Sequence, residues 1–325
     1  MEANDRWPPL IVPSREIPVP ASISAGAQAA LAGRIIPSIP YPSADDHAAW
    51  VARREAGEEA MVSGLLPRIA GIEADVTEHQ IGEARIYEVR PGGVSGNGVY
   101  LDIHGGALIS GGGEACRSLA ILHAAQMGMT VWAVDYRMPP EHPYPAALDD
   151  CVAAYRQLLH DYPANRIAIG GASAGANLAA ATVLRARDEG MPAPAAVVLL
   201  SPELDLTESG DTFRTNLGVD TKLPNSLMPV NLMYAAGHDL NHPYLSPLFG
   251  DFSKGFAPCY ITSGTRDLFL SNAVRMHRAL RQADILAELH VFEAAPHGLA
   301  LGIDTPEEVD FNRELMRFVS AHIGC

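Results

Sequence analysis

A run of small residues around Ser173 constrains this chain more than any other stretch. The segment Arg166–Ala180 begins as a short apolar run, passes through Gly171-Ala-Ser-Ala-Gly175 and continues as an Ala-rich helical segment. A strand that turns sharply into a helix strains the turn residue and leaves little room for side chains beside it. The pattern therefore fits the G-x-S-x-G turn, which presents a serine hydroxyl at a helix N-terminus. So short a motif also occurs by chance as a plain tight turn, so its meaning depends on the rest of the chain.

Strand-like and helix-like segments alternate on both sides of this turn. The alternation indicates an α/β fold with a mostly parallel sheet, covered by helices on both faces, in which ligands bind at the carboxyl ends of the strands. Before it, Ala74–His79 and Ala84–Val89 flank Gly82 and predict an antiparallel hairpin. The later strands are expected at Val99–Ile103, Thr130–Asp135, Arg166–Gly170, Ala195–Leu200, Cys259–Ser263 and Ala287–Phe292, and helices at Ala146–His160, Ala176–Arg187, Ser271–Gln282 and Pro306–His322.

Two segments depart from the alternation. Residues 1–70 are Pro-rich at first and then helical over Ala21–Ala32 and Ala44–Ile69, and residues 206–245 are polar and interrupted by Gly and Pro. We predict that they form two halves of a helical cap over a catalytic domain of residues 71–205 and 246–325. Their apolar side chains either line a substrate pocket or attach the cap to the core. They are Trp50, Leu65, Leu217, Leu223, Leu227, Met228, Leu232, Met233 and Tyr234.

Composition narrows the possible partners. A formal net charge of −15 disfavours nucleic acid and anionic membranes. No apolar run approaches the ~20 residues of a membrane span, and the Pro-rich start lacks a signal-peptide pattern, so we expect a cytoplasmic protein. The four cysteines, Cys116, Cys151, Cys259 and Cys325, are scattered, which favours reduced thiols over disulfides.

A serine nucleophile needs a histidine base and an acid that orients the histidine. Asp267 follows the strand Cys259–Ser263, and His297 follows the last strand, so both fall at the same sheet edge as Ser173. The chain order Ser, Asp, His is that of α/β-hydrolases. A solvent-exposed loop histidine and a helix-capping aspartate are the simpler alternatives. Other downstream candidates are placed less well: His238, His242, His277, His290 and His322 for the base, and Asp239 and Asp304 for the acid.

Acyl transfer also needs donors for the oxyanion, and His104-Gly105-Gly106-Ala107 after a strand is similar to an HGGG-type loop. We expect the amides of Gly105, Gly106 and Ala174 to be these donors, because glycines let the backbone approach a substrate closely. His104 precedes the serine and is expected to brace the loop through a hydrogen bond.

Several motifs together resemble the hormone-sensitive-lipase family of bacterial esterases (family IV), from about residue 74 to the C-terminus. They are His104–Ala107, Asp135–Asp150, Gly171–Ala179, Gly264–Asp267 and Pro296–Gly298. The resemblance implies an α/β-hydrolase fold with a helical cap and hydrolysis of short- to medium-chain carboxylic esters without a cofactor. It places the nucleophile, acid and base on Ser173, Asp267 and His297. Dimers are common in that family, so a homodimer is possible.

The chain departs from the family pattern at a few positions. Ala107 replaces the third glycine of the oxyanion loop, which predicts a tighter acyl pocket. Ala172 precedes the serine where a polar or β-branched residue is usual, and Ala176 replaces a common glycine. Glu203, after the next strand, either orders the loops near Ser173 or is a surface carboxylate.

Other functions remain open to different degrees. A lactonase or an amidase would use the same residues as a carboxylesterase. A non-catalytic small-molecule receptor would require a disabled triad, and all three members are present. A dinucleotide enzyme is disfavoured because the turn does not spell G-x-G-x-x-G, and a zinc hydrolase because no H-E-x-x-H or clustered His/Cys spacing occurs. We therefore expect neither a cofactor nor a metal.

Overall fold

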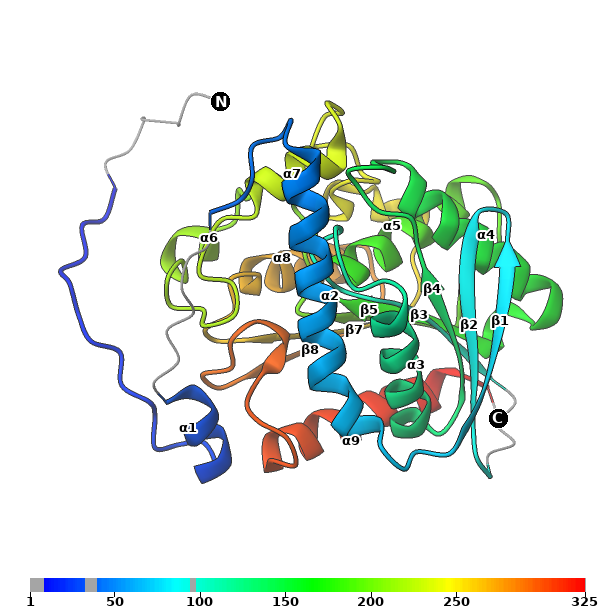
Figure 1. Cartoon of the computed structure of the whole chain (residues 1–325), viewed down its shortest axis with the longest axis horizontal. Coiled ribbons are helices and arrows are strands. Elements are labelled where there is room, and N and C mark those ends of the chain that lie inside the picture. Colours follow the sequence, from blue (N-terminus) through cyan, green and yellow to red (C-terminus); the bar gives the residue numbers. More distant parts are fainter. Residues whose placement is uncertain (1–8, 33–39, 94–97, 325) are drawn as a thin grey trace.

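The computed structural model describes residues 9–32, 40–93 and 98–324. Within these ranges, one eight-stranded sheet forms the centre of the fold (Figure 1). The strand order is β1-β2-β4-β3-β5-β6-β7-β8. β1 pairs antiparallel with β2 and β2 with β4, and the other neighbours run parallel. The strands are β1 (Ala74–Ile81), β2 (Ala84–Pro91), β3 (Val99–Ile103), β4 (Thr130–Asp135), β5 (Ile167–Ala172), β6 (Ala196–Leu200), β7 (Cys259–Gly264) and β8 (Ala287–Phe292).

The predicted hairpin and parallel strands are confirmed. The central strands run parallel and are apolar on both faces. All five residues of β3 are buried, as are the first five of β5, so helices must cover both sides. β5 extends to Ala172, two residues beyond the predicted end, and Arg166 belongs to the short turn η1 before it.

Helices cover both faces of the sheet. α4 (Ala146–Asp161), α5 (Ala174–Asp188) and α8 (Leu270–Gln282) pack into the larger apolar core, on one face. α3 (Glu114–Met127) and α9 (Pro306–His322) bury their apolar sides in a second core on the other face, which is the one turned toward the viewer in Figure 1. Short 3-10 turns complete the chain: η1 (Ala164–Arg166), η2 (Pro247–Phe249), η3 (Phe252–Lys254) and η4 (His297–Leu299).

The N-terminal segment contributes two helices. α2 (His47–Ile69) begins at Asp46, whose side chain accepts a hydrogen bond from the Ala49 amide, and it crosses the front of the molecule beside α3 (Figure 1). α1 (Ala25–Leu31) is shorter than predicted because Ser24 caps it. The Ser24 hydroxyl also donates to Glu307 Oε2 at 2.7 Å, which anchors α1 to the first turn of α9.

Residues 206–245 contain two short helices, as expected from their interrupted pattern. They are α6 (Thr212–Thr215) and α7 (Met228–Ala235). Cys116, Cys151 and Cys259 are buried free thiols, while Cys325 lies outside the described residues. Over the described ranges, no helix combines the length and the apolar character that a membrane crossing requires.

Candidate active site

Ser173 stands in the strained turn that its sequence context predicted. Its backbone has φ 58° and ψ −120°, a conformation that side-chain-bearing residues rarely adopt. The neighbouring glycines are required by space, because a Cβ on Gly171 or Gly175 would lie 2.1 Å or 1.9 Å from the carbonyl oxygen of Ile103. Since α5 begins at Ala174, the first amides of that helix have no partner inside it and face the position of the serine.

Asp267 and His297 come together at the same edge of the sheet. His297 Nδ1 lies 3.2 Å from Asp267 Oδ1, and Asp267 is fully buried in the turn after β7. The carboxylate also accepts hydrogen bonds from the Ser263 hydroxyl and the Phe269 amide, both at 2.9 Å. Burial opposes ionisation of Asp267, but the neighbouring His297 and the Phe269 amide keep its pKa below the ordinary value. The structure therefore supplies the acid–base pair that a serine nucleophile needs.

The His297 imidazole is held in an environment that favours its charged form. Burial would lower its pKa, but the Asp267 carboxylate beside it raises the pKa above the ordinary value. The edge of the Phe269 ring meets the imidazole at a centroid distance of 4.9 Å. An imidazole oriented at Nδ1 by a carboxylate presents Nε2 as the basic atom.

Two residues that sequence reasoning missed support the His297 loop. Asp220, from the segment before α7, accepts hydrogen bonds from the amides of His297 at 3.2 Å and Leu268 at 2.8 Å. It thereby ties the base loop to the turn that carries Asp267. Ser201, in a strained conformation with φ 43°, accepts a hydrogen bond from the Gly298 amide at 3.1 Å. No motif surrounds Asp220 in the sequence, so only its contacts reveal it.

The predicted oxyanion loop lies against the elbow. A Cβ on Gly105 would lie 2.8 Å from the carbonyl oxygen of Ala172 and 3.6 Å from Ser173 Cβ. Gly106 has φ 125°, and a Cβ there would lie 2.0 Å from the carbonyl oxygen of Ser110. Ala107 continues the loop with φ 55°, so this alanine occupies a conformation that normally favours glycine. The loop backbone thus reaches the serine without side chains between them.

His104 braces this loop, as predicted. Its Nδ1 donates to the carbonyl oxygen of Gly105 at 2.8 Å, and its ring stacks on Tyr136 at a centroid distance of 4.0 Å. The Tyr136 hydroxyl donates to the carbonyl oxygen of His104 at 3.0 Å. Burial lowers the pKa of His104, which keeps the imidazole neutral.

Glu203 is buried, so its interpretation as a surface carboxylate was wrong. It is 1% exposed, and its backbone amide donates to the carbonyl oxygen of Ser173 at 3.3 Å. Among the described residues, neither carboxyl oxygen has a hydrogen-bond partner of good geometry, although the nearby Asn231 side chain acts to lower the pKa of Glu203. Burial, with the nearby charge of Glu208, raises the pKa of Glu203 to about 8. At pH 7 the neutral carboxylic acid is therefore the favoured form of Glu203, which lies close enough to His297 for their charges to interact.

An apolar cluster covers the oxyanion loop and the Asp267 turn. It joins the N-terminal segment to residues 206–245: Tyr41, Trp50, Ala107, Ile109, Phe213, Leu223, Leu227, Val230, Met233, Leu268 and Phe269. Four of the nine predicted pocket or attachment residues belong to it. Tyr234 instead packs into the core under α4 and α5, whereas Leu232 is exposed, because α7 turns one side toward the sheet and the other toward solvent. Leu217, in the segment before α7, is also exposed.

Known proteins resemble the chain in sequence and in structure. Residues 100–301 match a family model described as alpha/beta hydrolase fold. An acetyl-hydrolase of Streptomyces hygroscopicus is 38% identical over 66% of this chain and 71% of its own length, and an esterase of Acinetobacter venetianus is 32% identical over 60% and 65%. The crystal structure of esterase E25 superposes with a TM-score of 0.90 at 32% identity, covering 97% of this chain and 99% of that one.

A further solved structure, of an esterase from the bacterial hormone-sensitive lipase family, is 29% identical with a TM-score of 0.76 over 88% of this chain and 94% of its own. With the elbow, the Asp–His pair and the glycine loop at one sheet edge, these similarities identify the chain as a member of the alpha/beta hydrolase fold family and, within it, as an esterase of the hormone-sensitive-lipase type.

Proposed function

We propose that this protein is a serine carboxylesterase that hydrolyses short- to medium-chain carboxylic esters through an acyl-enzyme intermediate. The observation that carries the proposal is the contact between His297 Nδ1 and Asp267 Oδ1 at the edge where Ser173 stands in its strained turn. Relatives described as esterases and acetyl-hydrolases support the same class of reaction.

The reaction begins with proton transfer. His297 Nε2 takes the proton of the Ser173 hydroxyl as its oxygen attacks the ester carbonyl carbon, and Asp267 stabilises the resulting imidazolium. The negative charge that develops on the carbonyl oxygen is accepted by the amides of Gly105, Gly106 and Ala174. Loss of one such donor typically slows acyl transfer by about 10²–10³.

The tetrahedral intermediate then collapses. The bond to the alcohol oxygen breaks, His297 gives that oxygen its proton, and the acyl group stays on Ser173 as an ester. A water molecule, deprotonated by His297, then attacks the acyl carbon. The bond between this carbon and the Ser173 oxygen breaks, His297 returns the proton to that oxygen, and the carboxylic acid leaves. No cofactor is needed for either half of this sequence.

The cap is also part of the proposal. Helix α2 and residues 206–245 would form the cover of the acyl pocket, because Trp50 of α2 and apolar side chains of residues 206–245 share one cluster with Ala107. Ala107, with a methyl group where glycine is usual, narrows this pocket and favours short acyl chains.

The test is hydrolysis of p-nitrophenyl esters with acyl chains of increasing length. The purified protein should release p-nitrophenol from the short esters, and Ser173→Ala should remove this activity. Mass spectrometry should find an acyl adduct on Ser173 after a rapid quench. A wild-type protein that turns over neither esters nor lactones would overturn the proposal.

A further inference from the structure

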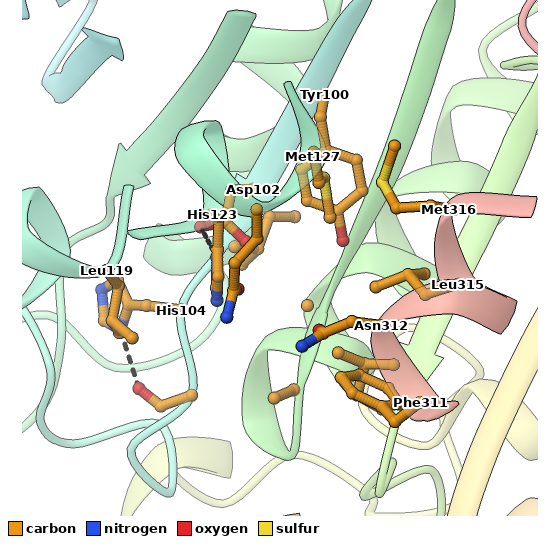
Figure 2. A pocket seen from close by; sticks show the side chains of 16 residues that line it. Tyr100, Asp102, His104, Leu119, His123, Met127, Phe311, Asn312, Leu315 and Met316 are labelled. Carbon is orange, nitrogen blue, oxygen red and sulfur yellow. Dashed lines mark hydrogen bonds and ion pairs between the residues drawn. The ribbon is translucent and has the colours of Figure 1, made fainter. Parts of the chain in front are cut away.

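A cavity lies behind the elbow, on the face of the sheet that α3 and α9 cover (Figure 2). Its deeper part has a volume of about 120 Å³ and its outer part about 200 Å³. The two parts share lining residues from α3, α9 and the elbow, including Leu119, Asn312 and Ala172, so they adjoin each other. This cavity is separate from the cap cluster, which lies over Ala107.

Catalytic segments form one wall of the cavity. Gly105 of the oxyanion loop and Gly171 line its deeper part, and Gly298 and Leu299, directly after the catalytic base, line its outer part. Ala172 lines both parts, and with only a methyl group it leaves open the space that a larger residue before the serine would fill. Because His297 protonates the departing alcohol, the alcohol part of an ester leaves on the side of the imidazole, and the two residues that follow this imidazole, Gly298 and Leu299, line the outer part of the cavity.

A second Asp–His pair stands in the cavity. His123 Nδ1 of α3 lies 2.8 Å from Asp102 Oδ2 of β3, and Asp102 is 2% exposed. Figure 2 shows this pair on one side of the space, with Phe311, Asn312 and Leu315 of α9 opposite. The His123 side chain is 27% exposed, and its Nε2 has no hydrogen-bond partner within the described part of the chain. This ring atom is therefore available to a ligand, beside the side chains of Gln126 and Asn312, which line both parts of the cavity.

We infer that this cavity receives the alcohol part of the ester and that the Asp102–His123 pair selects alcohols that carry a second hydroxyl, such as mono-esterified diols and polyols. The inference rests on the proposed esterase function. A hydroxyl suits the pair because it donates to a neutral imidazole Nε2 and accepts from a protonated one. A charged group gains less, since Asp102 already neutralises the imidazolium. The aliphatic spacer would lie against Leu119, Phe311 and Leu315.

The distance between the two hydroxyls follows from the register of the sheet. Asp102 pairs with Gly170 of β5, three residues before Ser173. At the rise of a β-strand, three residues span about 10 Å, so the backbone of Asp102 lies about this far from that of Ser173 along the strand direction. A spacer of comparable length, such as a hexyl chain, would therefore carry the second hydroxyl to His123.

The experiment compares two acetates that differ at one atom, the monoacetate of a terminal hexanediol and heptyl acetate, with methyl acetate as the small-alcohol reference. His123→Gln removes Nε2 while its amide can still donate to Asp102. It should reduce the kcat/KM ratio of the hydroxylated over the heptyl ester about fivefold or more. Leu119→Trp fills the cavity and should lower kcat/KM for both long alcohols about tenfold more than for methyl acetate, through KM.

Controls separate the cavity from general effects. His290→Gln is the matched variant, because His290 is 25% exposed and pairs with Glu288 at 3.1 Å but lies outside the cavity. It should leave the alcohol preference as in the wild type. Hydroxylated and plain acyl chains on methyl esters should not respond to His123→Gln. If esters are hydrolysed but neither cavity variant changes the alcohol preference, or if the acyl series responds instead, the inference fails while the esterase function stands. If no ester is hydrolysed, both fail.

Discussion

Two Asp–His pairs stand on opposite sides of the elbow, and their local geometry is much alike. In each, a buried strand or turn carboxylate faces the Nδ1 atom of a partly exposed histidine, at 3.2 Å for Asp267–His297 and 2.8 Å for Asp102–His123. Their surroundings differ. His297 follows a strand end at the sheet edge that also carries the serine turn and the glycine loop, whereas His123 lies within α3 and lines the cavity behind the elbow. An Asp–His pair is thus a way to orient an imidazole, and the neighbours of Nε2 decide its role.

The most severe test of this contrast removes the proposed nucleophile, the Ser173 hydroxyl. Ser173→Ala should lower kcat by about 10⁵ or more, because no other hydroxyl stands in the strained turn. Circular dichroism and thermal unfolding should show a folded protein. Ester hydrolysis within tenfold of the wild-type rate would mean that the reaction occurs elsewhere.

Equivalent changes in the two pairs should have unequal effects. Asp267→Asn should reduce kcat by about 10⁴, since the imidazole would lose its orientation and the stabilisation of its charged form. Asp102→Asn should act mainly on KM for hydroxylated alcohols. Steady-state kinetics on one ester series measures both variants, and similar losses of kcat would remove the distinction between the two pairs.

Glu203 is a third buried carboxyl near the elbow, and unlike Asp267 and Asp102 it is not hydrogen-bonded to a histidine within the described ranges. Its pKa of about 8 lies above that of an unfolded glutamate, so the folded protein holds a proton that the unfolded chain has released between pH ~4.5 and 8. Stability should fall as pH rises through this window. Glu203→Gln should remove that fall. The unfolding free energy of the variant minus that of the wild type should therefore be about 3–5 kcal/mol larger at pH 9 than at pH 4. Urea unfolding of both proteins at several pH values measures this difference. Stability profiles of wild type and variant that run parallel with pH would contradict the prediction.

The smallest expected effect concerns the support of His297. Asp220→Asn removes a negative charge that raises the pKa of His297, so the acid limb of kcat/KM should move to lower pH. In the wild type that limb should lie above the ~6.5 reference, because the base must be neutral and its pKa is raised. We expect kcat to drop about tenfold through loosened orientation of the base loop. An unchanged pH profile would limit Asp220 to a structural role.

The strand–helix alternation and the main motifs could be predicted because they depend on local chemistry. Glycine at 171 and 175 is demanded by close backbone approach, and the apolar runs of the central strands are demanded by burial on two faces. Helix ends were less predictable. α1 starts at Ala25 because Ser24 caps it, and the Ser24 hydroxyl also donates a hydrogen bond to Glu307, which lies near the other end of the chain.

The sequence by itself determined the order of the elements and the candidate triad, since strand ends in a parallel sheet share one edge wherever the chain places them. Only the tertiary structure decided which side chains meet there. It joined Asp220 to the base loop, buried Glu203 without a partner and brought His123 of α3 onto Asp102 of β3. These contacts link residues far apart in the chain, and their electrostatics depend on burial, which no local pattern of residues encodes.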